Sequence, residues 1–204
     1  MSDATESIPE SRIYTPTSYF EPLPLDKIFG QKQPLEVEIG CGTGTFLAEY
    51  AAQETERNFL GIERLLGRVR KVNKKSVRRG LLNVAIVRVE ASYAIQYFLE
   101  EQSVQAFHIY FPDPWPKRKH WKNRLVAPPL LPLLERCLVP EGKVYLRTDN
   151  RDYYEQMLET FEGSERFAPI EAPSKLTAIR TDFEKGFNEQ GIPTLYCQYR
   201  LSSD

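Results

Sequence analysis

Short apolar runs alternate with stretches of helical spacing along most of the chain. The runs predict strands at residues 35–39, 58–62, 84–89, 104–111, 143–147 and 194–201. Apolar positions three or four residues apart predict helices at residues 43–52, 65–79, 93–99, 125–138 and 152–161. Strands that alternate with helices in this way predict an α/β fold, with a mostly parallel sheet covered by helices on both faces.

The chain has 204 residues, enough for a single α/β domain with a full core. Residues 1–33 contain four prolines and show no sustained period. This pattern predicts a flexible N-terminal arm that is anchored by a few aromatic residues. The remaining residues, 34–204, are expected to form one domain.

The formal net charge is −1 at pH 7, so the molecule as a whole is not a polycation. Binding to nucleic acid must therefore depend on basic residues that gather locally. The three cysteines are far apart, lack metal-binding spacing and accompany only two histidines. We expect neither a disulfide framework nor a metal site, which fits a reducing cytoplasm.

The N-terminus lacks the basic start and apolar core of a secretory signal. No apolar run approaches the roughly 18 residues that a membrane-spanning helix needs. The sequence therefore predicts neither secretion nor insertion into a membrane.

Candidate chemistry falls where the predicted strands end. The first five strands are followed in turn by Gly40, Glu63, Glu90, Asp113 and Asp149. The carboxyl ends of parallel strands meet at one edge of a sheet, and α/β proteins bind ligands at that edge. These residues therefore predict a single site.

The first strand ends in the pattern E-x-G-x-G-x-G, from Glu38 through Gly40 and Gly42 to Gly44. These glycines let the backbone turn sharply and approach a ligand closely. The third glycine comes one residue too early for the dinucleotide pattern G-x-G-x-x-G, and the carboxylate of Glu38 would repel a pyrophosphate. That carboxylate suits the cationic end of S-adenosylmethionine (SAM). The alternative is a tight turn without a ligand.

Two further strand-end acids are candidates for contacts with the cofactor. Glu63 lies 19 residues after Gly44, where an acid commonly accepts hydrogen bonds from ribose hydroxyls. Alternatively, Glu63 caps the helix that follows it. Glu90 and Ala91 are candidates to hold the adenine amine, although an exposed glutamate at a strand end is commonplace.

A proline-rich loop at residues 108–124 follows the fourth strand. Its prolines, at positions 112, 114 and 116, restrict the backbone around Asp113 and predict a stiff turn that presents one carboxylate. Five Lys or Arg residues follow between positions 117 and 124, interleaved with aromatic side chains. A positioned carboxylate beside a cationic aromatic loop suits chemistry on a base of a polyanion. The alternative is a surface turn with a solvated charge run.

The predicted helix at 65–79 carries a basic stripe. Its members recur every three or four residues: Arg64, Arg68, Lys71, Lys75 and Arg78. The opposing apolar side is predicted to contain Leu65, Leu66, Val69 and Val72. Like charges four residues apart destabilise a helix, and a polyanionic partner would relieve that cost. The alternative is an incidental basic face.

Taken together, these motifs resemble the bacterial tRNA (guanine-N7)-methyltransferase family. The resemblance runs from about residue 35 to the C-terminus. Its most specific parts are residues 111–117 with their basic tail and residues 181–184, which precede Gly186 and Gly191. It implies the class I methyltransferase fold, a Rossmann-like sheet with an antiparallel C-terminal strand. It also implies a cytoplasmic enzyme that methylates N7 of a guanine in the variable loop of tRNA, at position 46 in tRNA numbering.

Carried over by position, the resemblance assigns roles to single residues. It implies that Glu38, Glu63, Glu90 and Asp113 contact SAM, and that Asp113 is also the catalytic acid. The implied substrate contacts are Lys117, Asp149, Thr181, Asp182, Phe183 and Glu184. Together with the helical stripe, the basic residues expected to contact RNA are Arg118, Lys119, Lys122 and Arg124.

Two other functions remain open from the sequence. A SAM enzyme that acts on a small molecule or a protein is disfavoured by the basic clusters and by residues 181–184. An RNA-binding module without catalysis is disfavoured by the intact glycine pattern and by Glu63. Both a monomer and a homodimer are compatible with the sequence.

Overall fold

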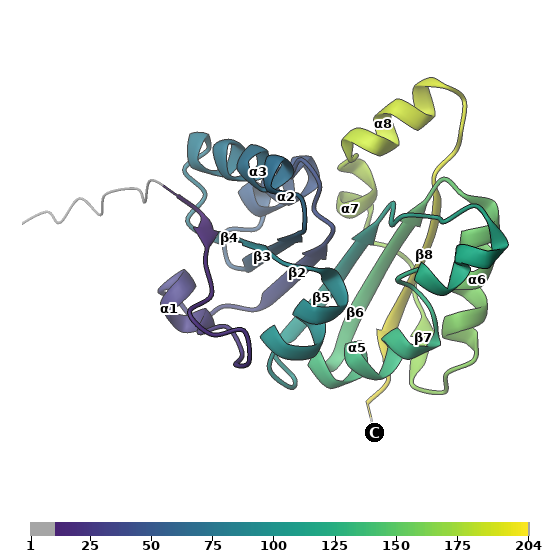
Figure 1. The fold of residues 1–204 in the computed structure, drawn as a ribbon, viewed down its shortest axis with the longest axis horizontal. Helices are drawn as coiled ribbons and strands as arrows, with labels where there is room; N and C mark the ends of the chain where they lie inside the picture. The colour runs from purple at the N-terminus through teal and green to yellow at the C-terminus, as the bar shows by residue number, and fades with distance from the viewer. Residues whose placement is uncertain (1–10, 204) are drawn as a thin grey trace, which may run out of the picture.

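An eight-stranded sheet runs through the centre of the molecule (Figure 1). The computed structural model describes residues 11–203, with strand order β1-β4-β3-β2-β5-β6-β8-β7. The strands are β1 (Ile13–Tyr14), β2 (Leu35–Ile39), β3 (Asn58–Glu63), β4 (Val84–Arg88), β5 (Val104–Tyr110), β6 (Leu138–Thr148), β7 (Phe167–Pro169) and β8 (Leu195–Leu201). Strands β1 to β6 pair in parallel, and β8 is antiparallel to β6 and β7. The predicted fold class, with its antiparallel C-terminal strand, is confirmed.

The central strand β2 determines where the site lies. Each of its five residues is buried, as expected for a strand with partners on both sides and helices on both faces. In the parallel register, Ile39 lies beside Ile62 of β3 and Ile109 of β5. The carboxyl ends of these three strands therefore stop at the same level, and the residues that follow them meet at one edge.

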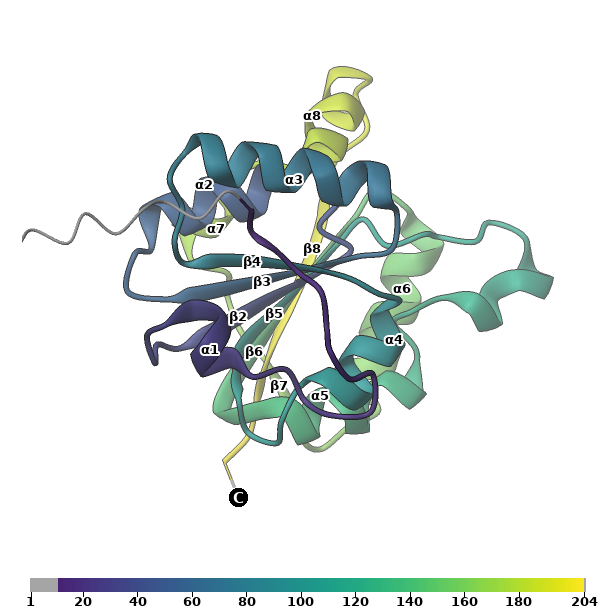
Figure 2. The ribbon, with the colours of Figure 1, turned by 60° about the vertical axis from the view of Figure 1, so that its left-hand side comes forward.

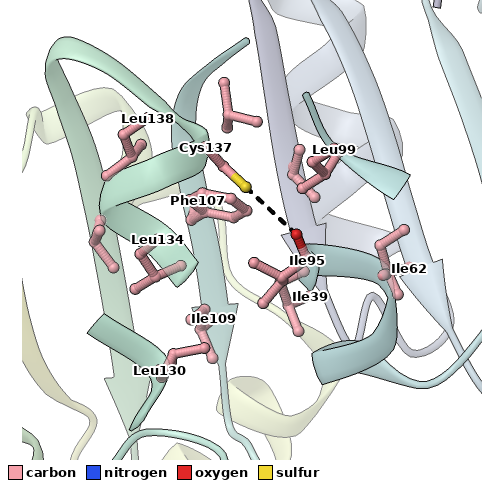
Figure 3. Close-up of a cluster of buried hydrophobic side chains, with 14 of the residues drawn as sticks. Ile39, Ile62, Ile95, Leu99, Phe107, Ile109, Leu130, Leu134, Cys137 and Leu138 are labelled. Atoms are coloured by element: carbon pink, nitrogen blue, oxygen red, sulfur yellow. Dashed lines mark hydrogen bonds between the residues drawn. The ribbon is translucent and has the colours of Figure 1, made fainter. Parts of the chain in front are cut away.

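Helices cover both faces of the sheet (Figure 2). One apolar layer holds α2 (Thr45–Gln53), α3 (Leu66–Arg78) and α7 (Ser174–Ala178). The other holds α1 (Leu25–Phe29), α4 (Ala91–Tyr93), η1 (Ala94–Phe98), η3 (Pro128–Leu130), α5 (Leu131–Cys137) and α6 (Arg151–Glu162). Figure 3 shows part of this second layer, where Ile39 and Ile109 of the sheet pack with Ile95 and Leu134. Within the described residues, no helix is long and apolar enough to cross a membrane.

Two predicted helices differ from the observed ones. The helix predicted at 125–138 begins as the 3-10 turn η3 and ends at Cys137, because consecutive prolines at 128 and 129 lack amide donors and Leu138 already belongs to β6. The helix predicted at 93–99 starts earlier, as α4, and continues as the π-helical turn η1. Both predictions placed the element correctly and its ends wrongly.

Residues 11–33 differ from the expected flexible arm, because they pack against the domain. Strand β1 adds a short parallel edge strand beside β4. Leu23 is buried, and its amide donates a hydrogen bond to the carbonyl oxygen of Phe98 at 3.0 Å. The remainder of the predicted arm, residues 1–10, lies outside the described residues.

A buried polar pair joins β2 and β5 beneath α2. Nε2 of His108 lies 2.6 Å from Oε2 of Glu36, and Nδ1 lies 2.8 Å from the hydroxyl of Tyr110. Arg57 pairs with the other carboxylate oxygen of Glu36. Burial acts to raise the pKa of Glu36, but the hydrogen bond and charge of His108 and the charge of Arg57 outweigh it and lower the pKa. Tyr110 also lines the site, so this pair supports the floor on which the site rests.

Candidate active site

The glycine turn connects β2 with α2. Gly40, Gly42 and Gly44 have φ of 72°, 55° and 70°, in the left-handed region that favours glycine. A Cβ atom at Gly44 would lie 2.6 Å from Cγ1 of Val72, so this glycine also lets α3 pack against the turn. A Cβ atom at Gly40 would meet no described atom within 4 Å, which leaves the turn open to a ligand on that side.

Glu63 ends β3 and ties two turns together. Its Oε2 accepts a hydrogen bond from the amide of Gly42 at 3.1 Å, and its Oε1 accepts one from the amide of Leu65 at 2.8 Å. Nη1 of Arg68 lies 3.8 Å from the same carboxylate. The Glu63 side chain thus orders the glycine turn and the approach to α3, while it lines the cleft described below.

Glu38 is buried in β2, directly before the turn. It is only 4% exposed, and its Oε2 has no hydrogen-bond partner within the described part of the chain. Burial raises the pKa of Glu38 to about 8, although the charges of Arg147 and Lys75 act to lower it. Glu38 borders a small cavity together with Thr181 and Asp182. A buried carboxyl group with an unused acceptor oxygen suits a cationic ligand group.

A cleft of about 730 Å³ lies along the carboxyl edge of the sheet. It collects residues that the sequence predicted from separate strand ends: Gly40, Glu63, Glu90, Ala91, Asp113 and Asp149. Glu90 also caps α4, because its carboxylate accepts a hydrogen bond from the amide of Tyr93 at 2.9 Å. A cleft of this size is typical of sites for small molecules and cofactors.

The proline loop holds Asp113 at the rim of this cleft. Phe111 and Trp115 adopt left-handed φ values of 51° and 45°, so the backbone is strained on both sides of Asp113. Nε of Arg124 donates a hydrogen bond to the carbonyl oxygen of Pro114 at 2.7 Å, and its guanidinium lies 4.3 Å from the ring centre of Trp121. The loop is therefore fixed from within, while the carboxylate of Asp113 stays exposed.

The basic tail of the loop contains two kinds of position. Arg124 is only 4% exposed and Nη1 donates to Oε1 of Gln156 at 2.8 Å, so the expected RNA contact is replaced by a structural role. The other basic side chains are exposed: Lys117, Arg118, Lys119 and Lys122. Of these, Lys122 also lines the cleft.

Helix α3 begins at Leu66, so that Arg64 precedes the helix instead of opening it. Val69 and Val72 are buried as predicted. Leu65 and Leu66 are 46% and 39% exposed, and their placement on the buried apolar side was therefore wrong. Leu65 is the N-cap residue and Leu66 the first residue of α3, and this end of the helix borders the open cleft that Leu65 lines.

The basic stripe lies along one flank of α3 and is only partly solvated. Arg64, Lys71 and Arg78 are exposed, whereas Arg68 and Lys75 are half-buried. Nζ of Lys75 donates a hydrogen bond to Oγ1 of Thr45 at 2.6 Å, and Arg68 pairs with Glu63 as described above. Two members of the stripe therefore belong to the site, and three remain free to meet a polyanion.

Residues 181–184 begin the helix α8 (Asp182–Glu189), which the sequence analysis did not predict. Oγ1 of Thr181 accepts a hydrogen bond from the amide of Glu184 at 3.0 Å and caps the helix. The carboxylate of Asp182 accepts a hydrogen bond from the hydroxyl of Thr43 in the glycine turn. Phe183 is 46% exposed and lines the cleft.

Glu184 occupies a different environment from its neighbours. It is fully buried, its Oε2 lies 2.9 Å from Nη1 of Arg147, and its Oε1 accepts a hydrogen bond from Tyr196 at 2.5 Å. The structure thus separates this carboxylate from the cleft that Phe183 lines. An arginine in the fifth predicted strand was a signal that a buried partner existed, because buried arginines are paired.

Two contacts between aromatic rings at the site were also not predicted from the sequence. The ring centre of Phe111 lies 6.5 Å from that of Phe183 and 5.8 Å from that of Phe187, and all three rings line the cleft. The spacing of four residues between Phe183 and Phe187 was the sequence pattern that could have predicted a helix here. In the described residues, no group of three or more His, Cys, Asp or Glu side chains could hold a metal ion.

Comparisons with known proteins show which family this chain resembles. The model of a family described as "Putative methyltransferase" matches residues 32–196. The tRNA (guanine-N(7)-)-methyltransferase of Halorhodospira halophila is 39% identical over 185 residues, which cover 88% of this chain and 80% of that protein. This chain belongs to the tRNA (guanine-N7)-methyltransferase family. The protein of the same name from Thermotoga maritima is 36% identical, and the match covers 85% of this chain and 56% of that protein.

Solved structures show the same fold for this methyltransferase. The crystal structure of the 16S rRNA methyltransferase KamB matches with a TM-score of 0.64, covering 90% of this chain and 95% of that one. At 12% sequence identity the likeness concerns the fold alone. It confirms the class I methyltransferase fold that the family resemblance implied.

SAM is the methyl donor of this methyltransferase, and the residues of the site fit it. The unpartnered oxygen of Glu38 and the open side of Gly40 suit the cationic amino acid end of the donor. The carboxylate of Glu63 lies on the cleft wall, where it suits hydroxyl groups of the ribose. Leu125, Leu130 and Leu133 add an apolar wall for the flat base.

Binding of SAM at pH 7 is expected to release close to one proton from wild-type protein. The pKa of Glu38 is about 8 in the free protein, so its carboxyl group is neutral at pH 7. A cationic group in contact favours the carboxylate, which lowers the pKa and expels the proton. Calorimetric titration in buffers with different ionisation enthalpies measures the number of protons released.

The variant Glu38→Gln should bind SAM more weakly and release no proton. Glu155→Gln is the matched control, because Glu155 is an exposed glutamate of α6 that lines neither the cleft nor the small cavity. Proton release that persists in Glu38→Gln would contradict the role of Glu38.

Proposed function

We propose that this methyltransferase transfers the methyl group of SAM to N7 of a guanine in tRNA, at position 46 of the variable loop. The observation that carries the proposal is the shared cleft, which is lined by Asp113 in its stiff loop, by Gly40 of the glycine turn and by Glu63. The names of the relatives point to the same class of substrate. We also propose a cytoplasmic location, where the three free, buried cysteines stay reduced.

Methyl transfer to N7 requires that the protein align the two reactants, and it requires no proton transfer. Guanine N7 carries a lone pair in the plane of the ring and no proton, so no general base is required. When bound, SAM supplies a methyl group on a positively charged sulfur. The cleft therefore has to hold N7 in line with that bond and to stabilise the charge that develops on the purine.

Two carboxylates lie where they can serve the base. Asp113 at the cleft rim stabilises the cationic ring that methylation at N7 produces, or accepts hydrogen bonds from N1–H and the exocyclic amine. Asp149 lines the same cleft and is the second candidate for gripping that edge. Phe183 and Phe187 offer ring faces on which a purine stacks. Lys117 follows Asp113 by four residues in the same loop, and its ammonium group suits a phosphate or guanine O6.

The exposed basic residues form the proposed RNA surface. They lie on α3 and on the loop with the 3-10 turn η2 (Arg118–Asn123), and both segments flank the cleft. The proposed contacts to phosphate are Arg64, Lys71, Arg78, Arg118, Lys119 and Lys122. Because phosphate contacts release counterions, binding through this surface depends steeply on salt.

Methylation of bulk tRNA tests the proposed function directly. Unmodified tRNA is incubated with the protein and SAM labelled in the methyl group, then digested and mapped by mass spectrometry. The label is expected in 7-methylguanosine from the variable loop. Label in another nucleoside, or none in RNA at all, would reject the proposal.

The variant Asp113→Asn is expected to lower the single-turnover rate by about a hundredfold or more, because it removes a charge aimed at the developing cation. Affinity for SAM should change only modestly, since other residues hold the donor. Asp26→Asn, at an exposed position of α1, is the matched control for the loss of one negative charge. An unchanged rate in Asp113→Asn would remove this residue from the chemistry.

Neutralising Arg64, Lys71 and Arg78 together is expected to weaken tRNA binding and to flatten its salt dependence. Each lost phosphate contact reduces the slope of log K against log salt by about 1. Replacement of Lys27, Lys32 and Arg200, exposed basic residues outside α3 and the proline loop, is the control for the loss of three charges. Filter binding at several salt concentrations gives the slopes. Equal slopes for the stripe variant and wild-type protein would place the RNA elsewhere.

A further inference from the structure

Arg147 is a buried cation beneath the site, and its hydrogen bonds reach beyond Glu184. It lies in β6 and is only 2% exposed. Its Nη1 donates hydrogen bonds to the carbonyl oxygen of Ile179 at 2.8 Å and to Oε2 of Glu184 at 2.9 Å. Its Nη2 donates to the carbonyl oxygen of Leu176 at 2.5 Å. All three acceptors belong to residues 174–189, the segment formed by α7 and α8, which we call the flap.

The flap needs such an anchor, because α8 projects from the body of the molecule (Figures 1 and 2). Among the described residues, Glu184 is the only buried residue of α8. Its carboxylate is held by Arg147 on one oxygen and by Tyr196 on the other. The position of α8 therefore depends on this polar clamp together with the ring contacts that Phe183 and Phe187 make with Phe111.

The flap brings two side chains to the cofactor end of the cleft. Asp182 accepts the hydrogen bond from Thr43 in the glycine turn. A Cβ atom on Gly42 would lie 3.9 Å from the ring of Phe183, and the guanidinium of Arg68 lies 5.7 Å from the centre of that ring. A shift of α8 would move both side chains away from the turn.

Arg147 is itself fixed from the side of the sheet. Its guanidinium lies 4.1 Å from the ring centre of Tyr110, whose hydroxyl is bonded to His108 in the pair with Glu36. Its charge also acts on Glu38 at the turn. One side chain thus connects the buried floor, the flap and the carboxyl group suited to the cationic end of the donor.

We propose that Arg147 is a positioning residue for methyl transfer, which holds the flap so that Asp182 and Phe183 close over the glycine turn. This inference rests on the proposed function and adds to it a residue that touches neither substrate nor donor. The planar guanidinium is essential to the role, because only a fork of donors reaches two carbonyl oxygens and one carboxylate at once. A lysine keeps the charge and loses this geometry.

The test compares Arg147→Lys with Arg136→Lys. Arg136 is a matched control, because it also donates hydrogen bonds to three acceptors, in its case the backbone carbonyl oxygens of Ile95, Gln96 and Leu99 in the opposite layer. Three quantities are measured: the melting temperature, the Kd for SAM by calorimetry, and cleavage by trypsin after the exposed residues Arg180 and Lys185. The last two report on the flap and the turn without requiring activity.

We expect both variants to lose some thermal stability. Only Arg147→Lys should weaken SAM binding, by about tenfold, and expose the flap to trypsin. Its single-turnover rate should fall further still, because small misplacements in a site cost as much as a hundredfold. Glu184→Gln, which keeps the shape and loses the charge, should show the same changes to a smaller degree and serves if Arg147→Lys does not fold.

Unchanged SAM affinity and unchanged cleavage in a folded Arg147→Lys or Glu184→Gln protein would overturn the proposal and leave the clamp a purely structural pair. These two readouts do not depend on which RNA is the substrate. If the wild-type protein failed to methylate tRNA, the proposed function would be rejected. SAM affinity and trypsin cleavage would still show whether Arg147 positions the flap.

Discussion

The common level at which the parallel strands end is the constraint on which this site depends. In the observed register, Ile39, Ile62 and Ile109 lie side by side, so the glycine turn, Glu63 and the proline loop start from one line. Backbone hydrogen bonds fix this register, and a slip by one residue would turn every buried side chain of a strand to the wrong face. The placement of five chemically useful residues therefore follows from the same interactions that form the core.

Among the described residues that line the cleft and the small cavity, one buried side-chain polar atom departs from the rule that such atoms are hydrogen-bonded. Oε2 of Glu38 has no partner among the described residues, whereas the neighbouring carboxylates of Glu36, Glu63 and Glu184 all have theirs. An unpaired buried acceptor costs free energy, and it is retained where a ligand supplies the missing donor. The unsatisfied atom marks the place of the cationic group more sharply than the glycine turn does.

The hydrophobic pattern was sufficient to predict the strands and helices in the central part of the fold, but not those at its margins. The strands β2 to β6 and the helices between them carry clear periods, because each buries a continuous apolar face. The segment 11–33 carries no such period, because β1 has only two residues, and in α8 the apolar period is limited to Phe183 and Phe187. Leu65 and Leu66 misled the prediction for a different reason: they lie at the start of α3, where the helix borders the cleft and meets no packed layer.

The sequence alone determined which residues stand at strand ends, that a SAM-type turn follows the first strand, and that basic residues gather in two segments, because these properties depend on neighbours along the chain. Only the tertiary structure decided that Arg124 is buried under the proline loop, that Glu184 pairs with Arg147 instead of facing the cleft, and that Glu38 has an unused oxygen. Such partners are separated by tens of residues, and only the packed sheet fixes the distances that decide whether a charge meets solvent, a ligand or another charge.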